Sequence, residues 1–85
     1  MRHAGSESLD ALEDLLIEIR KLEGLKEKKR GTFYRGPSGF VHFHEDPAGL
    51  FGDLRRKEGW RKYRVNTRGE KKAFVAEARR VLERM

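Results

Sequence analysis

Two histidines and a nearby carboxylate have the residue types and spacing of a metal site. His42 and His44 stand two positions apart, so in an extended strand both imidazoles point to the same side. We expect Asp53 opposite His42 on the next strand, with Asp46 as a further oxygen ligand. Such a set can bind zinc or another divalent ion, and the alternative is a half-exposed histidine row with a His–Asp ion pair. His3 is the only other histidine, so a third imidazole would come from the N-terminal tail or from a neighbouring chain.

Basic side chains interleave with an indole in residues 55–64, a pattern suited to nucleic-acid binding. A tryptophan can stack on a base while flanking cations contact phosphates. Exposed cations of the last predicted helix extend this basic surface. The predicted nucleic-acid-binding residues are Arg55, Arg56, Lys57, Trp60, Arg61, Lys62, Lys72 and Arg79. The alternative is that Trp60 is core or half-core and the cations form a solvated loop.

The charge distribution also favours a polyanionic partner. The 85-residue chain has a net charge of +6 and a pI near 10. Residues 1–24 carry six acidic and three basic side chains, whereas residues 25–85 carry 17 basic and eight acidic ones. A compact basic domain attracts nucleic acid through long-range steering and counterion release. The alternative is that the acidic first segment docks beside the basic remainder and neutralises it.

The sequence offers little for catalysis. Without cysteine there is no thiolate nucleophile, thiolate metal site or disulfide. The serines and threonines lack the surroundings of a nucleophile, and no glycine pattern matches a phosphate-binding loop. A histidine with Asp53 could form an acid–base dyad, but nothing marks a pocket around it. We therefore expect a protein that is not an enzyme and needs no cofactor, apart from zinc or another divalent ion under the metal-site alternative.

Helical periodicity is clear at both ends of the chain. Leucines and isoleucines at helical spacing predict a helix over Ser8–Glu23, ended by Gly24. Thr67 and Glu70 have the spacing of a capping box and begin a last helix. Residues 1–7 are expected to be a flexible leader, and residues 26–30 a basic connector. The apolar stripe of the last helix is Phe74, Ala78, Val81, Leu82 and Met85.

Between these helices the apolar period changes to two, which is typical of strands. Turn sequences at residues 36–39 and 46–49 have proline in second position and glycine in fourth. They separate three expected antiparallel strands, and a fourth could follow. The expected strands are 32–35, 40–45, 50–54 and, as the fourth, 60–65.

The register of these strands decides which side chains share a face. Pairing that keeps apolar side chains together sets Tyr34 beside Val41 and Val41 beside Leu54. The opposite face would then be a platform for stacking bases, unless a helix or a second subunit covers it. That face is expected to carry Phe33, Arg35, Phe40, His42, His44, Phe51 and Asp53.

The stretch from Gly31 to Leu54, with an aromatic-basic strand, a glycine-rich turn and Phe-Val-His-Phe-His-Glu-Asp, resembles the central hairpin of the MmcQ/YjbR-like family. The pair Gly59-Trp60 precedes a late strand in many members. The resemblance covers about half the chain, which lacks the longer segment that the family usually inserts before that strand. It implies an α+β fold and a link to DNA binding, and it transfers no catalytic residues. The α-β-β-β-α order also looks like a double-stranded-RNA-binding domain, with Lys71-Lys72 as the basic helix start.

Together these features predict one α+β domain over residues 8–85, with two helices and a small antiparallel sheet. We expect a nucleic-acid-binding or anion-binding accessory protein; the alternatives are a metal-binding His-x-His domain and a structural interaction domain. A thin core and a second apolar sheet face favour a homodimer. No apolar run approaches the roughly 20 residues that span a bilayer, so we expect no membrane partner and a cytoplasmic location. Abundant arginine and scarce side-chain amides fit a thermophilic source.

Overall fold

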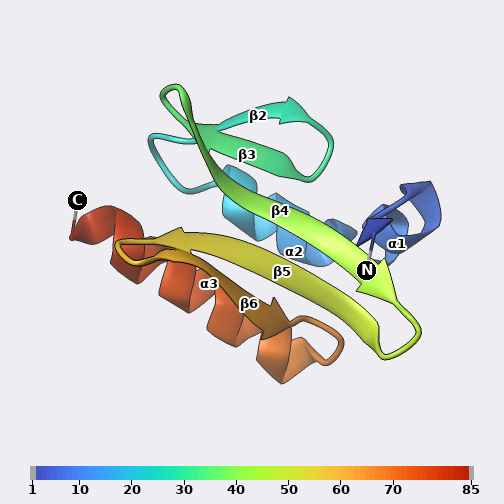
Figure 1. Cartoon of the computed structure of the whole chain (residues 1–85). Helices are drawn as coiled ribbons and strands as arrows, with labels where there is room; N and C mark the ends of the chain where they lie inside the picture. Colours follow the sequence, from blue (N-terminus) through green and yellow to red (C-terminus); the bar gives the residue numbers. More distant parts are fainter. Residues whose placement is uncertain (1, 85) are drawn as a thin grey trace.

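The chain folds into two layers, a sheet and the helices packed against one of its faces (Figure 1). The computed structural model describes residues 2–84 and confirms the predicted α+β class. Within residues 2–84, no helix has the length and apolar character to cross a membrane. The elements in chain order are β1 (Arg2–His3), α1 (Ser6–Ala11), α2 (Glu13–Arg20), β2 (Lys26–Lys29), β3 (Thr32–Arg35), β4 (Ser38–Asp46), β5 (Gly49–Arg56), β6 (Gly59–Arg64) and α3 (Arg68–Glu83).

The sheet is antiparallel and has the order β2-β3-β4-β5-β6. β1 lies off this path and pairs with the last residues of β4, whereas β3 pairs with its first residues. Gly49 and Gly59 open β5 and β6 with φ angles of 132° and 120°, a region that favours glycine and permits the tight turns before them. All four strands expected between the helices are present: the strand expected at 32–35 is β3 with the same ends, and the other three have shifted ends.

The core lies between the sheet and the helices. α3 begins with the predicted capping box, in which Thr67 and Glu70 exchange side-chain-to-backbone hydrogen bonds. Gly52 on β5 leaves room for two aromatic rings, because a Cβ there would lie 2.8 Å from Phe74 and 3.0 Å from Phe43. Of the predicted stripe of α3, Phe74 and Ala78 are buried and Met85 lies outside the described residues. The other buried apolar residues are Leu12, Leu15, Leu16, Ile19, Leu22, Phe33, Phe40, Val41, Phe43, Leu54, Val65 and Val75.

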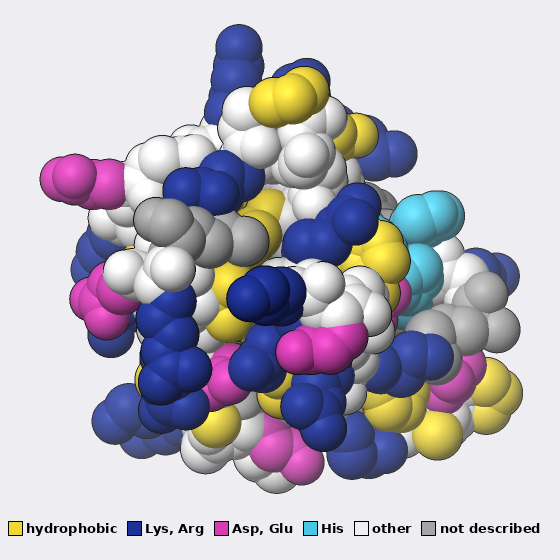
Figure 2. Space-filling view, turned by 60° about the vertical axis from the view of Figure 1, so that its left-hand side comes forward, with side chains coloured by type: hydrophobic (Ala, Val, Ile, Leu, Met, Phe, Trp, Pro, Cys, Tyr) yellow, Lys and Arg dark blue, Asp and Glu magenta, His cyan; other side chains and the backbone are white. Residues whose placement is uncertain are grey.

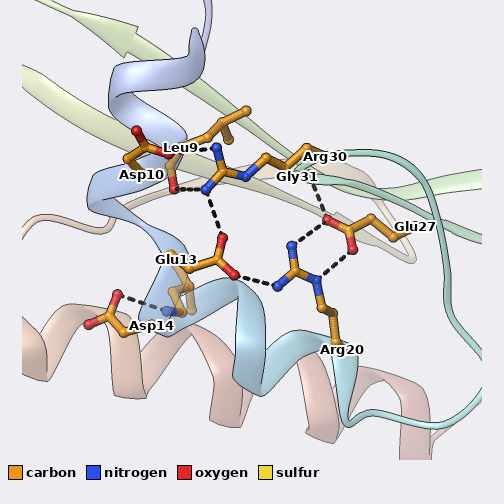
Figure 3. A network of polar contacts seen from close by, with 9 residues as sticks. Leu9, Asp10, Glu13, Asp14, Arg20, Glu27, Arg30 and Gly31 are labelled. Carbon is orange, nitrogen blue, oxygen red and sulfur yellow. Dashed lines mark hydrogen bonds and ion pairs between the residues drawn. The ribbon is translucent and has the colours of Figure 1, made fainter.

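The predicted helix Ser8–Glu23 is wrong in its continuity and its ends. Two helices, α1 and α2, occupy this region and meet at Leu12, which is fully buried. Arg30, in the turn after β2, pairs with Asp10 on α1 at 2.7 Å and with Glu13 on α2 at 2.8 Å (Figure 3). A single guanidinium therefore connects the two sides of the break, a contact that helical periodicity does not encode.

The basic connector expected at residues 26–30 is largely a strand. β2 pairs with β3, and Glu27 on β2 receives two hydrogen bonds from the guanidinium of Arg20 on α2 (Figure 3). Glu27 also accepts the backbone amide of Gly31 at 2.9 Å. Tertiary contacts thus stabilise a strand whose sequence, Lys-Glu-Lys-Lys, has no apolar alternation.

The N-terminal residues also differ from the expected leader over 1–7. Arg2 and His3 form β1, whose register sets Arg2 opposite Glu45 and His3 opposite His44. The carboxylate of Glu45 accepts hydrogen bonds from Arg2, from the amide of Gly5 and from the hydroxyl of Ser8. One acidic side chain therefore fixes this segment to the sheet, whereas Met1 lies outside the described residues.

The predicted register is correct between β4 and β5 and wrong between β3 and β4. Val41 pairs with Leu54 as expected, but its partner on β3 is Phe33 and not Tyr34. The next residue of β3, Tyr34, pairs with Gly39, so Phe40 between Gly39 and Val41 has no partner and is the extra residue of a β-bulge. Phe33 and Phe40 are both buried at 1% exposure, so the predicted face with three phenylalanines does not form.

Candidate functional site on the open sheet face

One face of the sheet is turned away from the helices. α2 and α3 lie behind the strands in the view of Figure 1, and they pack against the face that carries Val41, Phe43 and Leu54. Side chains alternate between faces along each strand, so the neighbouring positions point outward. We call this outward surface the open sheet face. Its residues are Tyr34, His42, His44, Phe51, Asp53, Arg55, Trp60, Lys62 and Arg64.

Aromatic rings and cations contact one another across this face. The guanidinium of Arg55 lies 4.7 Å from the Trp60 ring, and that of Arg64 lies 5.3 Å from the Phe51 ring. The ammonium of Lys62 is 5.8 Å from Phe51. At the other end of the sheet, Lys28 on β2 is 4.3 Å from the ring of Tyr34. Each cation thus lies over an aromatic ring, with its charge still facing outward.

Trp60 is presented to the outside. It is 42% exposed, so it is not a core residue, and its covered part is the part that lies on the sheet. Its ring lies beside Gly39, where an added Cβ would be 3.6 Å away, and its centroid is 4.4 Å from that of His42. The indole therefore lies on the sheet against Gly39, His42 and Arg55, with part of its surface open to the outside.

The histidines gather beside this aromatic patch. His42 Nδ1 lies 3.0 Å from His44 Nε2, and Asp53 Oδ2 lies 2.8 Å from His44 Nε2 and 3.7 Å from His42 Nδ1. His3, brought in by β1, adds a third imidazole, and the three rings offer nitrogen atoms within 4.8 Å of one another. The predicted set His42, His44 and Asp53 is therefore assembled, with His3 in addition. Asp46 is not part of it and accepts the amide of Ala48 in the β4–β5 turn.

Two polar atoms of this cluster have unusual surroundings. Burial is the main cause that lowers the pKa of His42, and it outweighs the attraction of the Asp53 carboxylate. The lower pKa favours the neutral imidazole of His42. Asp53 is only 14% exposed, and its Oδ1 is buried with no hydrogen-bond partner among residues 2–84. Such an atom is rare in a folded domain.

The predicted nucleic-acid-binding residues divide between two sides of the molecule. Arg55, Trp60 and Lys62 lie on the open sheet face, whereas Lys72 and Arg79 line a depression between α2 and α3 with acidic neighbours on α2. The remaining three residues belong neither to the open sheet face nor to this depression. Arg56 binds Tyr63 and Glu77, Lys57 is exposed in the β5–β6 turn, and Arg61 alternates toward the helix side of the edge strand.

Sequence reasoning missed several members of the open sheet face. Arg64 shares the alternation of Trp60 and Lys62 along β6, so the two-residue period could have identified it. Lys28 and His3, which contact Tyr34 and the two histidines of this face, belong to strands that were not expected. Figure 2 shows Lys and Arg side chains spread over one side of the molecule, with histidines grouped at its edge.

The acidic residues of the N-terminal segment neutralise a different group of cations. Asp10, Glu13 and Asp14 form ion pairs with Arg20, Arg30 and Lys71. Arg20 also pairs with Glu27 on β2. Arg55 and Lys62 have no ion pair within residues 2–84. Arg64, on the same face, lies 3.9 Å from the carboxylate of Glu70, so the cations of this face without an ion pair in the described part of the chain are Arg55 and Lys62.

Comparisons of the chain with protein-family models, with curated proteins and with solved structures found no match. The resemblance to MmcQ/YjbR-like proteins stays a hypothesis.

Proposed function

We propose that the protein binds single-stranded nucleic acid on the open sheet face. The observation that carries the proposal is the exposed indole of Trp60 beside Arg55 and Lys62, two cations that have no ion pair within residues 2–84. Aromatic rings stack on bases of any sequence, and nearby cations contact the backbone. The basic surface expected from the sequence is thus reduced to one face, without the helix residues Lys72 and Arg79.

The arrangement favours a single strand over a duplex. Stacking on Trp60 or Phe51 requires an unpaired base, and the face of a sheet of several strands does not enter a groove as a helix does. Trp60 and Arg64, the partner of Phe51, are four residues apart on β6, about 13 Å at the usual strand rise. Sheets of this size stack two or three bases. Lys62 lies between the two rings and is placed to contact the intervening phosphate.

The charges predict how binding depends on salt. If Arg55, Lys62 and Arg64 each neutralise one phosphate, the logarithm of the binding constant should fall with the logarithm of salt concentration at a slope of about −2. A slope near zero would contradict backbone binding by these cations. A helix-side contribution would make the slope steeper, so its value also reports which surface is used.

The experiment is a fluorescence-anisotropy titration of labelled single-stranded and duplex oligonucleotides. Trp60→Ala should weaken single-strand binding by about 1–3 kcal/mol, the usual contribution of one stacked base. Lys62→Glu should weaken it and lower the salt slope by about one. Lys72→Glu is the matched control, because it makes the same charge change on the helix side. Equal losses in Lys62→Glu and Lys72→Glu would contradict a site on the open sheet face.

The homodimer expected from the sequence is the competing occupant of this face. Its premise of a second apolar sheet face has changed, because Phe33 and Phe40 are in the core. Sedimentation of the free protein measures whether it is a monomer or a dimer, and so distinguishes a second subunit from nucleic acid as the occupant. A dimer that dissociates in Trp60→Ala, together with no oligonucleotide binding, would replace the nucleic-acid proposal by an interaction surface.

A further inference from the structure

Three polar atoms converge at the end of the open sheet face where β1 meets β4. His42 Nδ1, His44 Nε2 and Asp53 Oδ2 form a triangle with sides of 2.8, 3.0 and 3.7 Å. His3 stands next to it, with ring centroids 4.9 Å from His44 and 5.9 Å from His42. Four metal-ligating side chains from three strands thus meet at one place.

Protons alone do not satisfy this triangle. A neutral imidazole carries one N–H, so a hydrogen on His44 Nε2 can point to Asp53 Oδ2 or to His42 Nδ1. A hydrogen on His42 Nδ1 as well would set two donors against each other at 3.0 Å. In either case a short contact between polar atoms lacks a full hydrogen bond. A cation at the centre would accept the lone pairs of all three atoms together.

The spacing fits a tetrahedral ion. Zinc bonds to nitrogen and oxygen of about 2.0–2.2 Å place neighbouring ligand atoms about 3.3 Å apart. The observed separations lie on both sides of this value, so only small side-chain movements are needed. We propose that His42, His44 and Asp53 form three corners of a zinc-type metal site and that His3 supplies the fourth.

The backbone holds these ligands in place. Sheet pairing sets His42 opposite Asp53 and His3 opposite His44, so their positions follow from strand register and not from a loop. β1 has only two residues, but Ala4 donates its amide to the Phe43 carbonyl at 3.1 Å, and Glu45 holds the flanking residues. Metal binding would add a further link between β1 and the sheet.

The ligand set selects the kind of metal. Three imidazoles and one carboxylate suit zinc and its neighbours cobalt, nickel and copper, whereas calcium and magnesium prefer oxygen alone. The chain contains no cysteine, so the site does not belong to the thiolate class of structural zinc sites. This inference does not depend on nucleic-acid binding, and its test uses no nucleic acid.

The test is isothermal titration of the full chain, purified without a histidine tag and stripped with a chelator, with zinc chloride. One zinc ion should bind per chain and raise the midpoint of thermal unfolding. His3→Ala should weaken zinc binding at least about tenfold and leave the unfolding midpoint of the metal-free protein nearly unchanged, since His3 is exposed. Absence of zinc binding, or full-affinity binding in both His3→Ala and His44→Ala, would overturn the proposal.

A matched pair of carboxylates tests the role of Asp53. Asp53→Asn replaces a charged ligand by a neutral amide and should weaken zinc binding about tenfold or more. Asp46→Asn makes the same change in the β4–β5 turn, outside the cluster, and should leave zinc affinity unchanged. Circular dichroism of each metal-free variant separates lost ligation from lost fold. Equal zinc affinity in the two variants would remove Asp53 from the site.

Discussion

The imidazole of His42 and the indole of Trp60 meet across the open sheet face, with ring centroids 4.4 Å apart. His42 lies on β4 and Trp60 on β6, so the two rings meet above the intervening strand β5. This contact connects the histidine cluster to the aromatic and basic surface. Because Trp60 is the only tryptophan of the chain, its fluorescence can report metal binding at the histidine cluster.

We expect copper or nickel ions to quench the fluorescence of Trp60, because open-shell ions quench nearby indoles. Quenching should saturate at one ion per chain. His3→Ala retains the contact of His42 with Trp60 but loses one imidazole, so the quenching curve should shift to at least about tenfold higher metal concentration. Identical curves for the two proteins would show that the quenching ion binds elsewhere.

The neighbouring arginines Arg55 and Arg56 should have different roles. Arg55 lies over Trp60 on the open sheet face, whereas Arg56 donates at 2.8 Å to Tyr63 and to Glu77 on α3. Arg55→Ala should weaken single-strand binding several-fold with little effect on thermal unfolding. Arg56→Ala should lower the unfolding midpoint and affect binding less. Paired anisotropy and melting curves check this, and a larger binding loss in Arg56→Ala would contradict the assignment.

Gly52 should be intolerant of any side chain. A Cβ would lie 2.8 Å from the Phe74 ring, which is 1% exposed and cannot retreat without repacking the core. Gly52→Ala should therefore lower the free energy of unfolding by about 1–3 kcal/mol. Gly69→Ala in the first turn of α3 is the control: its Cβ meets nothing closer than 4.0 Å, and it should stabilise by up to about 1 kcal/mol. Urea denaturation of both variants measures the difference.

The ion pair between Arg20 and Glu27 should make stability fall at acidic pH. The hydrogen bonds from Arg20 are the main cause that lowers the pKa of Glu27 below its ordinary 4.5. Because the folded pKa is the lower one, this stabilisation is present above pH 4.5 and is lost as the pH falls through the folded pKa. Glu27→Gln should thus be less stable than the native chain near pH 7, and the difference should shrink toward pH 3.

The control for this prediction is Glu23→Gln, which removes an exposed carboxylate with no ion pair within residues 2–84. Its stability should follow the native curve at both pH values. Urea midpoints at pH 7 and pH 3 provide the comparison. A Glu27→Gln difference that is constant with pH would mean that the side chain stabilises β2 through packing and not through its charge.

Local sequence determined the parts of the fold that depend on near neighbours. Thr67 and Glu70 are three residues apart, so the capping box at the start of α3 depends on near neighbours alone. The short turn between β4 and β5 fixes which residues oppose each other. His42 and Asp53 could therefore be paired from the sequence alone, as could Val41 and Leu54.

Tertiary structure decided the rest, because the partners are distant in the chain or the choice between them is small in energy. The bulge at Phe40 changes the face of one aromatic ring, and no local signal distinguishes it from regular pairing. β2 has no apolar pattern and is stabilised by Arg20 on a helix. His3 reaches His44 because β1 pairs with β4 and Glu45 binds the N-terminal segment, across about 40 residues of sequence. Residue types supplied the candidate ligands and cations, and long-range pairing decided which of them meet.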